Sequence, residues 1–483
     1  PDDHPRPSEA LGMDVAFRTV RCARVATPDV PGLSKILGAD TLEIVPNAGL
    51  NAGVDAWDVL QRLQASSLAD EQTLRSGISL DHVMTSCGGG YTPIGGGYTP
   101  IGGGYTPIGG GYTPIGGGYT PIGGPAEYGV PGRGGRMPVT LPLLDPWVRG
   151  AEVRPVVALL DSGVGHHPWF SGRVEVPSRP KTSTWFDGDV PLQVGAVWSG
   201  QTSGGATTLE RIGGINVDGG TGVTDPMTGA FAPLAGHGTF VAGIVRMGCP
   251  SARILSVPVL SSDGLAEEGF VLHTLLQLLD MHLRAVVTGN EEGVIDVLSI
   301  SLGYYHEDSD RPGQDSDLAA VLAAFGRIGV LVVAGAGNDA TTRPMLPAGF
   351  ARRASPHKAA VPLTSVGALN PDSRSVALFS NDGDWVVTRR RGAAVVSTLP
   401  TTIDAGGEGG ARAEGPSGSR PDRSLIDPDA YGGGFGMWSG TSFATPTLAA
   451  ELALLLTRRQ LHEPEDRVKR SLGALAQALG ERP

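Results

Sequence analysis

Three side chains that together can carry out nucleophilic acyl transfer occur in this sequence in the order Asp161, His237 and Ser442. In such a set the carboxylate orients the imidazole, the imidazole accepts the hydroxyl proton, and the serine oxygen attacks a carbonyl carbon. The side-chain amide of Asn338 can donate a hydrogen bond to the oxyanion that this attack creates. These four residues are therefore the candidate catalytic set.

Each candidate residue stands beside a segment with the pattern of a buried strand or of a helix start. Asp161 follows the apolar run VVALL, and Asn338 ends LVVAGAG. His237 and Ser442 each open a helix, and Pro446 is expected in the first turn of the second one, where no amide hydrogen is needed. Apolar strands that alternate with helices predict an open, doubly wound α/β domain with a mostly parallel sheet. Polar residues at the carboxyl ends of its strands then share one edge.

The motifs around these residues resemble those of the subtilisin-like serine proteases. They are, in chain order, ALLDSGVG, GHGTFVAGIV, SISLG, VVAGAGN and SGTSFATP. The resemblance covers about two thirds of the chain, from Arg154 to Arg458. It implies a subtilisin-like domain that hydrolyses peptide bonds, with Asp161 as the acid, His237 as the base, Ser442 as the nucleophile and Asn338 as the oxyanion donor.

The resemblance also implies two backbone walls that hold an extended polypeptide substrate as an added strand. The walls are Ser301, Leu302 and Gly303 on one side, and Gly335, Ala336 and Gly337 on the other. Met345 falls near the base of the specificity pocket, where it would favour small or medium apolar residues at the cleavage position. A loop methionine that packs on the core is the alternative interpretation.

Two segments depart from the family pattern. INVDGGTGVTDPMTG, residues 215–229, precedes the helix of His237 and is expected to be an inserted surface loop. RRRG, residues 389–392, stands where the family has APG, so no local structure is predicted for it.

A small module and a perfect repeat precede the subtilisin-like domain. Within residues 11–86 the patterns predict a strand, a strand, a helix and a strand, which is an α+β module with the size of the propeptides found in this family. GGGYTPI then occurs five times between Gly88 and Ile122. Three roles for the repeats stay open: a passive linker, ordered stacking that supports self-association through residues 88–122, and occupation of the cleft as a substrate or inhibitor in the same chain.

The predicted boundaries follow from these patterns. They are a tail at 1–10, the propeptide-like module at 11–86, the Gly-rich repeat segment at 87–124, a tether at 125–152, the subtilisin-like domain at 153–475 and a tail at 476–483.

Composition limits the partners. The net charge is −12 and the basic residues are scattered, so neither nucleic acid nor an anionic membrane is an expected partner. No apolar run of membrane-spanning length and no leader pattern is visible, which slightly favours the cytoplasm; secretion would require a chain already processed ahead of Pro1. Three cysteines provide no disulfide framework.

Ligand spacing predicts no metal site. The 10 histidines form no spaced set, and Asp81 and His82 are expected to have surface roles on opposite faces of a strand. Calcium is common in the family, but the candidate carboxylates have no calcium-loop spacing. They are Asp263, Asp308, Asp310 and Asp382. No cofactor is therefore expected to be required.

Two classes of function follow. The first is a serine endopeptidase whose N-terminal module and repeats inhibit it or form assemblies. The alternative is an assembly or binding protein with a latent subtilisin-like domain, in which the repeats mediate self-association.

Overall fold

The computed structural model describes residues 15–26, 36–46, 54–65, 79–86, 136–172, 174–175, 190–201, 207–220, 224, 229, 232, 234–289, 293–307, 317–353, 360–406, 412–413, 423–424, 426–427, 429–457 and 464–480. The five GGGYTPI repeats at 88–122 lie outside these ranges, so their three interpretations stay predictions.

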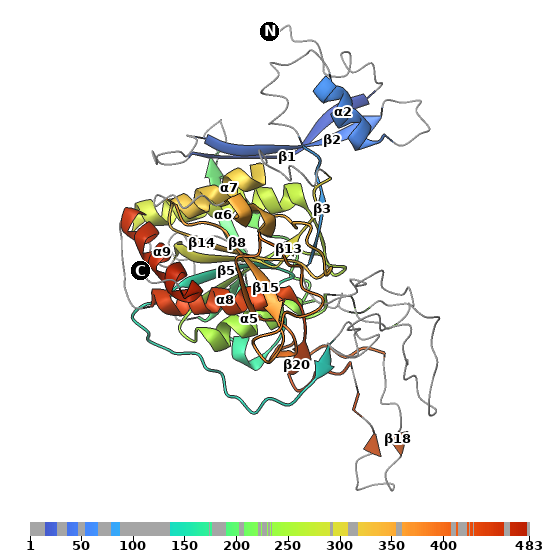
Figure 1. Ribbon diagram of the computed structural model, residues 1–483, viewed down its shortest axis with the longest axis vertical. Coiled ribbons are helices and arrows are strands. Elements are labelled where there is room, and N and C mark those ends of the chain that lie inside the picture. Colours follow the sequence, from blue (N-terminus) through green and yellow to red (C-terminus); the bar gives the residue numbers. More distant parts are fainter. Residues whose placement is uncertain are drawn as a thin grey trace.

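A parallel sheet forms the centre of the larger domain (Figure 1). Its strands are β5 (Val156–Asp161), β6 (Val174–Glu175), β7 (Leu192–Val194), β10 (Arg253–Pro258), β12 (Ile295–Ile300), β14 (Leu331–Gly335), β15 (Thr364–Leu369) and β16 (Thr388–Arg391). Their order across the sheet is β16-β15-β14-β12-β5-β10-β7-β6, and every neighbouring pair is parallel. The predicted α/β fold with a mostly parallel sheet is confirmed.

Helices cover both faces of this sheet. They are α5 (His237–Gly248), α8 (Thr441–Leu456) and α9 (Pro464–Leu479) on one face, and α6 (Glu268–Thr288) and α7 (Asp317–Arg327) on the other (Figure 1). Side chains of β5 alternate between the two cores, as the strand period of two requires. Val156, Ala158 and Leu160 join the core that contains α6 and α7. Val157 and Leu159 join the core that contains α5 and α8.

Helix α6 is apolar enough and, at 21 residues, long enough to cross a membrane, with a mean hydropathy of 1.3 over its most apolar stretch. The sequence expectation that no run reaches this length is therefore wrong. However, 61% of that stretch is buried inside the structure. The apolar character of α6 is accounted for by its place between the sheet and the N-terminal module.

The N-terminal module contains β1 (Val15–Ala26), β2 (Ile36–Pro46), α2 (Ala56–Ala65) and β3 (Val83–Ser86). The predicted order of strand, strand, helix and strand is confirmed. β1 and β2 form an antiparallel pair that lies over α6 and α7 (Figure 1). Val25 and Leu37 belong to the same apolar core as α6, and Arg21 pairs with Glu267 at 2.6 Å. The module thus shares its interior with the larger domain.

Arg136 begins a segment that packs on the larger domain, although the sequence assigns residues 125–152 to a tether. Its buried guanidinium donates to the backbone oxygens of Ala235 and Ala232 and lies 4.5 Å from the Trp438 ring. The next two residues form β4 (Met137–Pro138). β4 extends a small antiparallel sheet, in the order β17-β20-β4, that also contains β17 (Val395–Thr398) and β20 (Phe435–Trp438).

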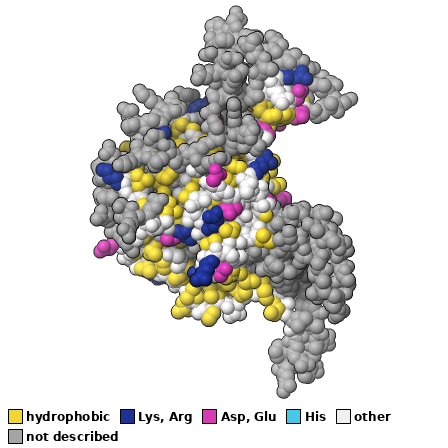
Figure 2. Space-filling view, in the orientation of Figure 1, with side chains coloured by type: hydrophobic (Ala, Val, Ile, Leu, Met, Phe, Trp, Pro, Cys, Tyr) yellow, Lys and Arg dark blue, Asp and Glu magenta, His cyan; other side chains and the backbone are white. Residues whose placement is uncertain are grey.

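Short elements complete the described chain. They are the antiparallel pairs β8 (Ala196–Gln201) with β9 (Thr207–Ile212) and β18 (Arg412–Ala413) with β19 (Arg423–Ser424), the strands β11 (Leu265–Glu267) and β13 (Leu302–Gly303), and the 3-10 turns η1 (Pro168–Phe170) and η3 (Ala348–Arg353). On the face drawn in Figure 2, basic and acidic side chains are interspersed rather than gathered by sign.

Candidate active site

Asp161 and His237 meet where a strand ends and a helix begins. Asp161 is the last residue of β5, and His237 is the first residue of α5. Asp161 Oδ1 lies 2.7 Å from His237 Nδ1 and also accepts from the backbone N of Ser162 at 2.8 Å. Both side chains are buried, at 1% and 0% exposure. The carboxylate therefore holds one ring nitrogen and directs the opposite nitrogen, Nε2, away from itself.

Gly238 allows the helix to approach the strand end closely. Its backbone N donates to Ser162 Oγ at 2.9 Å. A Cβ atom at this position would lie 2.1 Å from the backbone oxygen of Gly163, which is well inside van der Waals contact. The glycine of GHGT is therefore a packing requirement for bringing His237 to Asp161.

The carboxylate of Asp218 accepts hydrogen bonds from residues at the start of α5 that lie 18 to 21 positions later in the sequence. Its carboxylate accepts from Thr239 N at 2.9 Å, Thr239 Oγ1 at 2.7 Å, Gly236 N at 3.1 Å and Ser162 Oγ at 3.0 Å. Burial raises the pKa of Asp218 to about 6, although these donors act to lower it. At 2% exposure Asp218 is not a surface residue, so the expectation of a surface loop for 215–229 is wrong here.

Ser442 is the second residue of α8 and is fully buried. Its Oγ donates to the backbone oxygen of Ser301 at 3.3 Å, and Ser301 Oγ donates to the backbone oxygen of Ser442 at 3.3 Å. Within the described part of the chain His237 Nε2 has no hydrogen-bond partner. The His237 ring lies 5.4 Å from the ring of Phe443, which places it beside the residue that follows Ser442.

Pro446 accounts for the reciprocal bond at Ser442. α8 begins at Thr441, so Pro446 lies in its second turn, and the expectation that it lies in the first turn is wrong. Proline has no amide hydrogen for the carbonyl four residues earlier, which here is the carbonyl of Ser442. The hydroxyl of Ser301 supplies the missing donor.

Asn338 is oriented by the residue next to Ser442. Its Oδ1 accepts from both the backbone N and the Oγ1 of Thr441, each at 2.9 Å. Thr441 Oγ1 in turn accepts from the backbone N of Gly337 at 3.1 Å. These bonds occupy the oxygen end of the amide, so its NH₂ end points to the other side. The side chain is 4% exposed.

One of the two backbone walls, Leu302 and Gly303, pairs with a strand of the chain itself, whereas Gly335, Ala336 and Gly337 do not pair with that strand. β3 lies between β11 and β13 in an antiparallel sheet, with Ser86 opposite Leu302 and Thr85 opposite Gly303 (Figure 1). On its other side Met84 stands opposite Ala266 and is fully buried. β3 thus pairs with Leu302 and Gly303, beside which the resemblance implies a substrate strand, and the binding of substrate there stays a prediction. No sequence signal predicts β11, because three residues with no distinctive pattern form it.

A family model described as the subtilase family matches residues 153–479 of the chain, the part that contains this site. This chain belongs to the subtilase family. It is 26% identical over 254 residues to subtilisin E from Bacillus subtilis (strain 168), a stretch that covers 50% of this chain and 51% of that protein. The intracellular serine protease of Paenibacillus polymyxa is 24% identical over 306 residues, or 57% of this chain and 75% of that protein. This subtilase thus spans about half the length of the subtilisin E that it matches.

Met345 lies between the two walls of the groove in this subtilase. A Cβ atom on Gly337, which follows the end of β14, would lie 2.6 Å from Met345 Sδ. A Cβ atom on Gly303 in the opposite wall would lie 3.1 Å from Met345 Cγ. Met345 is 3% exposed and belongs to the core around α6. The interpretation of Met345 as a methionine that packs on the core is confirmed, and its role at the base of a specificity pocket stays a prediction.

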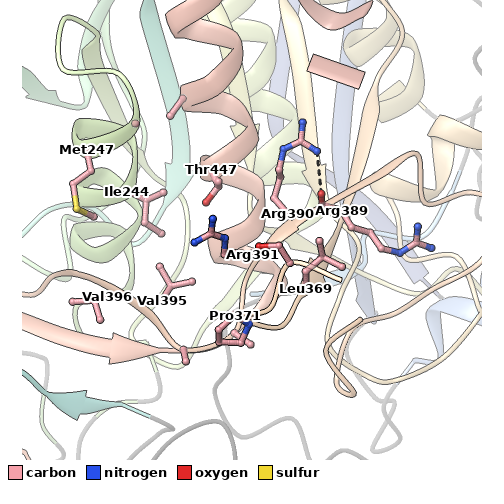
Figure 3. Close-up of a pocket in the computed structure, with 15 residues that line it drawn as sticks. Ile244, Met247, Leu369, Pro371, Arg389, Arg390, Arg391, Val395, Val396 and Thr447 are labelled. Atoms are coloured by element: carbon pink, nitrogen blue, oxygen red, sulfur yellow. Dashed lines mark hydrogen bonds between the residues drawn. The ribbon is translucent and has the colours of Figure 1, made fainter. Parts of the chain in front are cut away.

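A separate pocket of about 640 Å³ lies beside α5, α8 and β16 of this subtilase (Figure 3). The segment RRRG, for which the sequence predicts no structure, supplies β16 as an edge strand parallel to β15.

Arg389 pairs with Asp382, one of the calcium candidates. Among the other three, Asp263 is exposed, and Asp308 and Asp310 lie outside the described residues. The expectation that no calcium is required therefore stays a prediction.

Proposed function

We propose that this subtilase is a serine endopeptidase in which Asp161, His237 and Ser442 form the catalytic triad. The observation that carries the proposal is the buried 2.7 Å bond between Asp161 and His237, with Asn338 oriented through Thr441 next to the serine. A buried carboxylate that is hydrogen-bonded to a buried imidazole is typical of a catalytic site.

The reaction follows from these positions. Ser442 Oγ attacks the substrate carbonyl carbon while its proton passes to His237 Nε2, and Asp161 stabilises the imidazolium. The NH₂ group of Asn338 donates to the carbonyl oxygen as it becomes an oxyanion. The amine leaves with the proton from His237, and water then hydrolyses the acyl-enzyme by the same steps in reverse order.

The resting hydroxyl must turn before it can react. Ser442 Oγ donates to the Ser301 backbone oxygen, so a change of its side-chain rotamer exchanges this 3.3 Å bond for one to the imidazole. The bond lost is long and therefore weak. Catalytic hydrogen bonds are often long in the absence of substrate and tighten when the substrate complex forms.

Substrates of this enzyme are extended polypeptides with a small residue at the cleavage position. The groove already accepts an extended strand, β3, through backbone pairing on both sides. Met345 fills the space between the Gly303 and Gly337 walls, which leaves little room for a large side chain.

The N-terminal module serves as an intramolecular cap. Its strand β3 takes the place of substrate, and its sheet packs on α6, so an external peptide must displace it. Release follows a cut on the C-terminal side of β3, which ends at Ser86. The repeats at 88–122 would then stay on the enzyme, which holds the chain again at Arg136.

A fluorophosphonate probe, which reacts with activated serines, tests the enzyme directly. The full chain, before and after mild proteolytic activation, should be labelled at Ser442, and Ser442→Ala should abolish the label. Ser171→Ala, which removes an exposed serine, serves as the matched control and should leave the label intact. An activated chain that takes up no probe at Ser442 would refute the endopeptidase proposal. The N-terminal sequence of the activated chain locates the cut.

A further inference from the structure

Three potential metal ligands lie close together near the start of β3, the strand of the cap that pairs with β13. His82 directly precedes β3, and His306 and Glu307 follow β13, with which β3 pairs. His82 Nε2 lies 2.9 Å from Glu307 Oε2, and His306 Nε2 lies 3.7 Å from Glu307 Oε1. One ligand atom from each of the three residues lies within 4.8 Å of the others. The pairing of β3 with β13 therefore brings together residues that are 225 positions apart.

His82 is held in the orientation that a metal ligand needs. Its other ring nitrogen, Nδ1, lies 2.5 Å from Glu268 Oε2, and Glu268 Oε1 accepts from Tyr304 OH at 2.8 Å. The imidazole also stacks on the Tyr304 ring, with centroids 4.2 Å apart and planes 16° from parallel. A carboxylate on the distal nitrogen is the usual partner of a metal-bound histidine, because it fixes the tautomer and leaves Nε2 as the ligand.

We propose that His82, His306 and Glu307 bind a zinc-class divalent ion that fastens the cap strand into the groove. Two imidazoles and one carboxylate with an open fourth position suit Zn²⁺, whose ligands stand about 3.3 Å apart in a tetrahedron. The 2.9 Å from His82 Nε2 to Glu307 Oε2 and the 3.7 Å from His306 Nε2 to Glu307 Oε1 lie on either side of that value, with one imidazole at each carboxylate oxygen. The side chains of Glu307 and His306 are 30% and 16% exposed, which provides a path for the ion. The fastening role rests on the proposed function of β3 as a cap, whereas the site itself does not.

The competing account is an ion pair without metal. Burial acts to lower the pKa of His82, but its hydrogen bonds to Glu268 and Glu307 raise it above the usual value. A protonated His82 between two carboxylates explains those contacts and does not require His306 as a ligand. The substitution of His306 therefore separates the two accounts.

Zinc binding is measured on the full-length Ser442→Ala chain, which cannot cut itself, after removal of metal with a chelator. Titration with ZnCl₂ should show one site, and Co²⁺ should give the visible absorption of a tetrahedral complex. His306→Ala and Glu307→Gln should each weaken Zn²⁺ binding by more than about 10-fold, and Glu268→Gln should weaken it by about 10-fold. His166→Ala, which removes an exposed histidine elsewhere, should leave the affinity unchanged. Binding that is absent, or that is equal in His306→Ala, overturns the site.

The fastening role is measured by amide hydrogen exchange on the same chain. At about 100 times its Kd, Zn²⁺ should slow the exchange of the amides of residues 83–86 by up to about 100-fold, because it binds the docked strand more tightly than the undocked one. His306→Ala should remove this effect. Without zinc, the amides of residues 83–86 should exchange at the same rate in His306→Ala as in the parent chain. Zinc that binds without slowing the exchange of β3 overturns the fastening role. Neither readout requires protease activity, so absence of the fluorophosphonate label would refute the endopeptidase and leave the metal site standing.

Discussion

The hydroxyl of Ser442 donates to the backbone oxygen of Ser301, the residue directly before β13, which pairs with β3. Ser442 is thus bonded to the residue beside β13, and the hydroxyl of Ser301 returns a bond to the Ser442 carbonyl that Pro446 leaves without an amide donor. This exchange of bonds couples the start of α8 to the substrate groove. Occupation of the groove and orientation of the nucleophile are therefore parts of one local arrangement.

Removal of the oxyanion donor should lower turnover far more than binding. In Asn338→Ala, kcat of the activated enzyme should fall by about 10²- to 10³-fold with KM nearly unchanged, because the lost bond forms only as charge develops on the substrate oxygen. Steady-state hydrolysis of a peptide substrate measures both constants. A fall in kcat of less than about threefold would contradict the assignment of Asn338.

Gly238→Ala should destabilise the chain and lower its activity. The added Cβ would meet the Gly163 backbone oxygen at 2.1 Å, so the start of α5 must shift and His237 must move with it. We expect a loss of about 1 to 3 kcal/mol in the free energy of unfolding, measured by urea denaturation of the Ser442→Ala chain. Gly473→Ala is the matched control: it lies in α9 with open space around its Cβ, and should stabilise the chain by about 0.5 to 1 kcal/mol. Equal effects of the two substitutions would be inconsistent with the close approach at Gly238.

Asp218 should make the folded chain less stable as pH rises from about 4 to about 6. Its pKa is about 6 in the folded chain and near 3.8 when unfolded, so in this window the folded state holds a proton that the unfolded state has released. The free energy of unfolding then falls with rising pH, by about 3 kcal/mol for a shift of this size. Urea denaturation of Ser442→Ala from pH 4 to pH 8 measures the slope. Asp218→Asn should remove this part of the slope, and an unchanged slope would show that Asp218 does not titrate there.

Met345→Ala should enlarge the pocket between Gly303 and Gly337. Relative to the parent enzyme, kcat/KM for peptides with a large apolar residue at the cleavage position should rise by about 10-fold against peptides with alanine. Met345→Leu nearly conserves the volume and should keep the preference for small residues. A peptide library with one varied position reports the ratio, and the same profile for all three enzymes would exclude Met345 from the pocket.

Replacement of the five GGGYTPI units by a Gly-Ser linker of equal length should leave activity and oligomeric state unchanged, because a passive linker contributes only length. Light scattering after size-exclusion chromatography reports assembly, and peptide hydrolysis reports activity. A chain that assembles only with its repeats would favour the alternative of an assembly protein. A chain that becomes active on loss of the repeats would favour their occupation of the cleft.

The α/β fold, the family and the residues proposed for catalysis can all be predicted from local patterns in the sequence. GHGTFVAGIV joins a glycine needed for close approach to an apolar helix, and VVALLD joins a buried strand to its terminal carboxylate. Each pattern is complete within about ten residues. The strand and helix order of the N-terminal module was also legible in this way.

The contacts between residues that lie far apart in the sequence become visible in the tertiary structure. The carboxylate of Asp218, 21 positions before Thr239, caps α5 from a loop with no cap signature. β3 pairs with β11 and β13 while the sheet of the module packs on α6, and that docking places His82 beside Glu307, 225 positions away. The physical reason is that backbone pairing and burial between distant segments depend on how whole layers pack, and no short spacing along the chain encodes this.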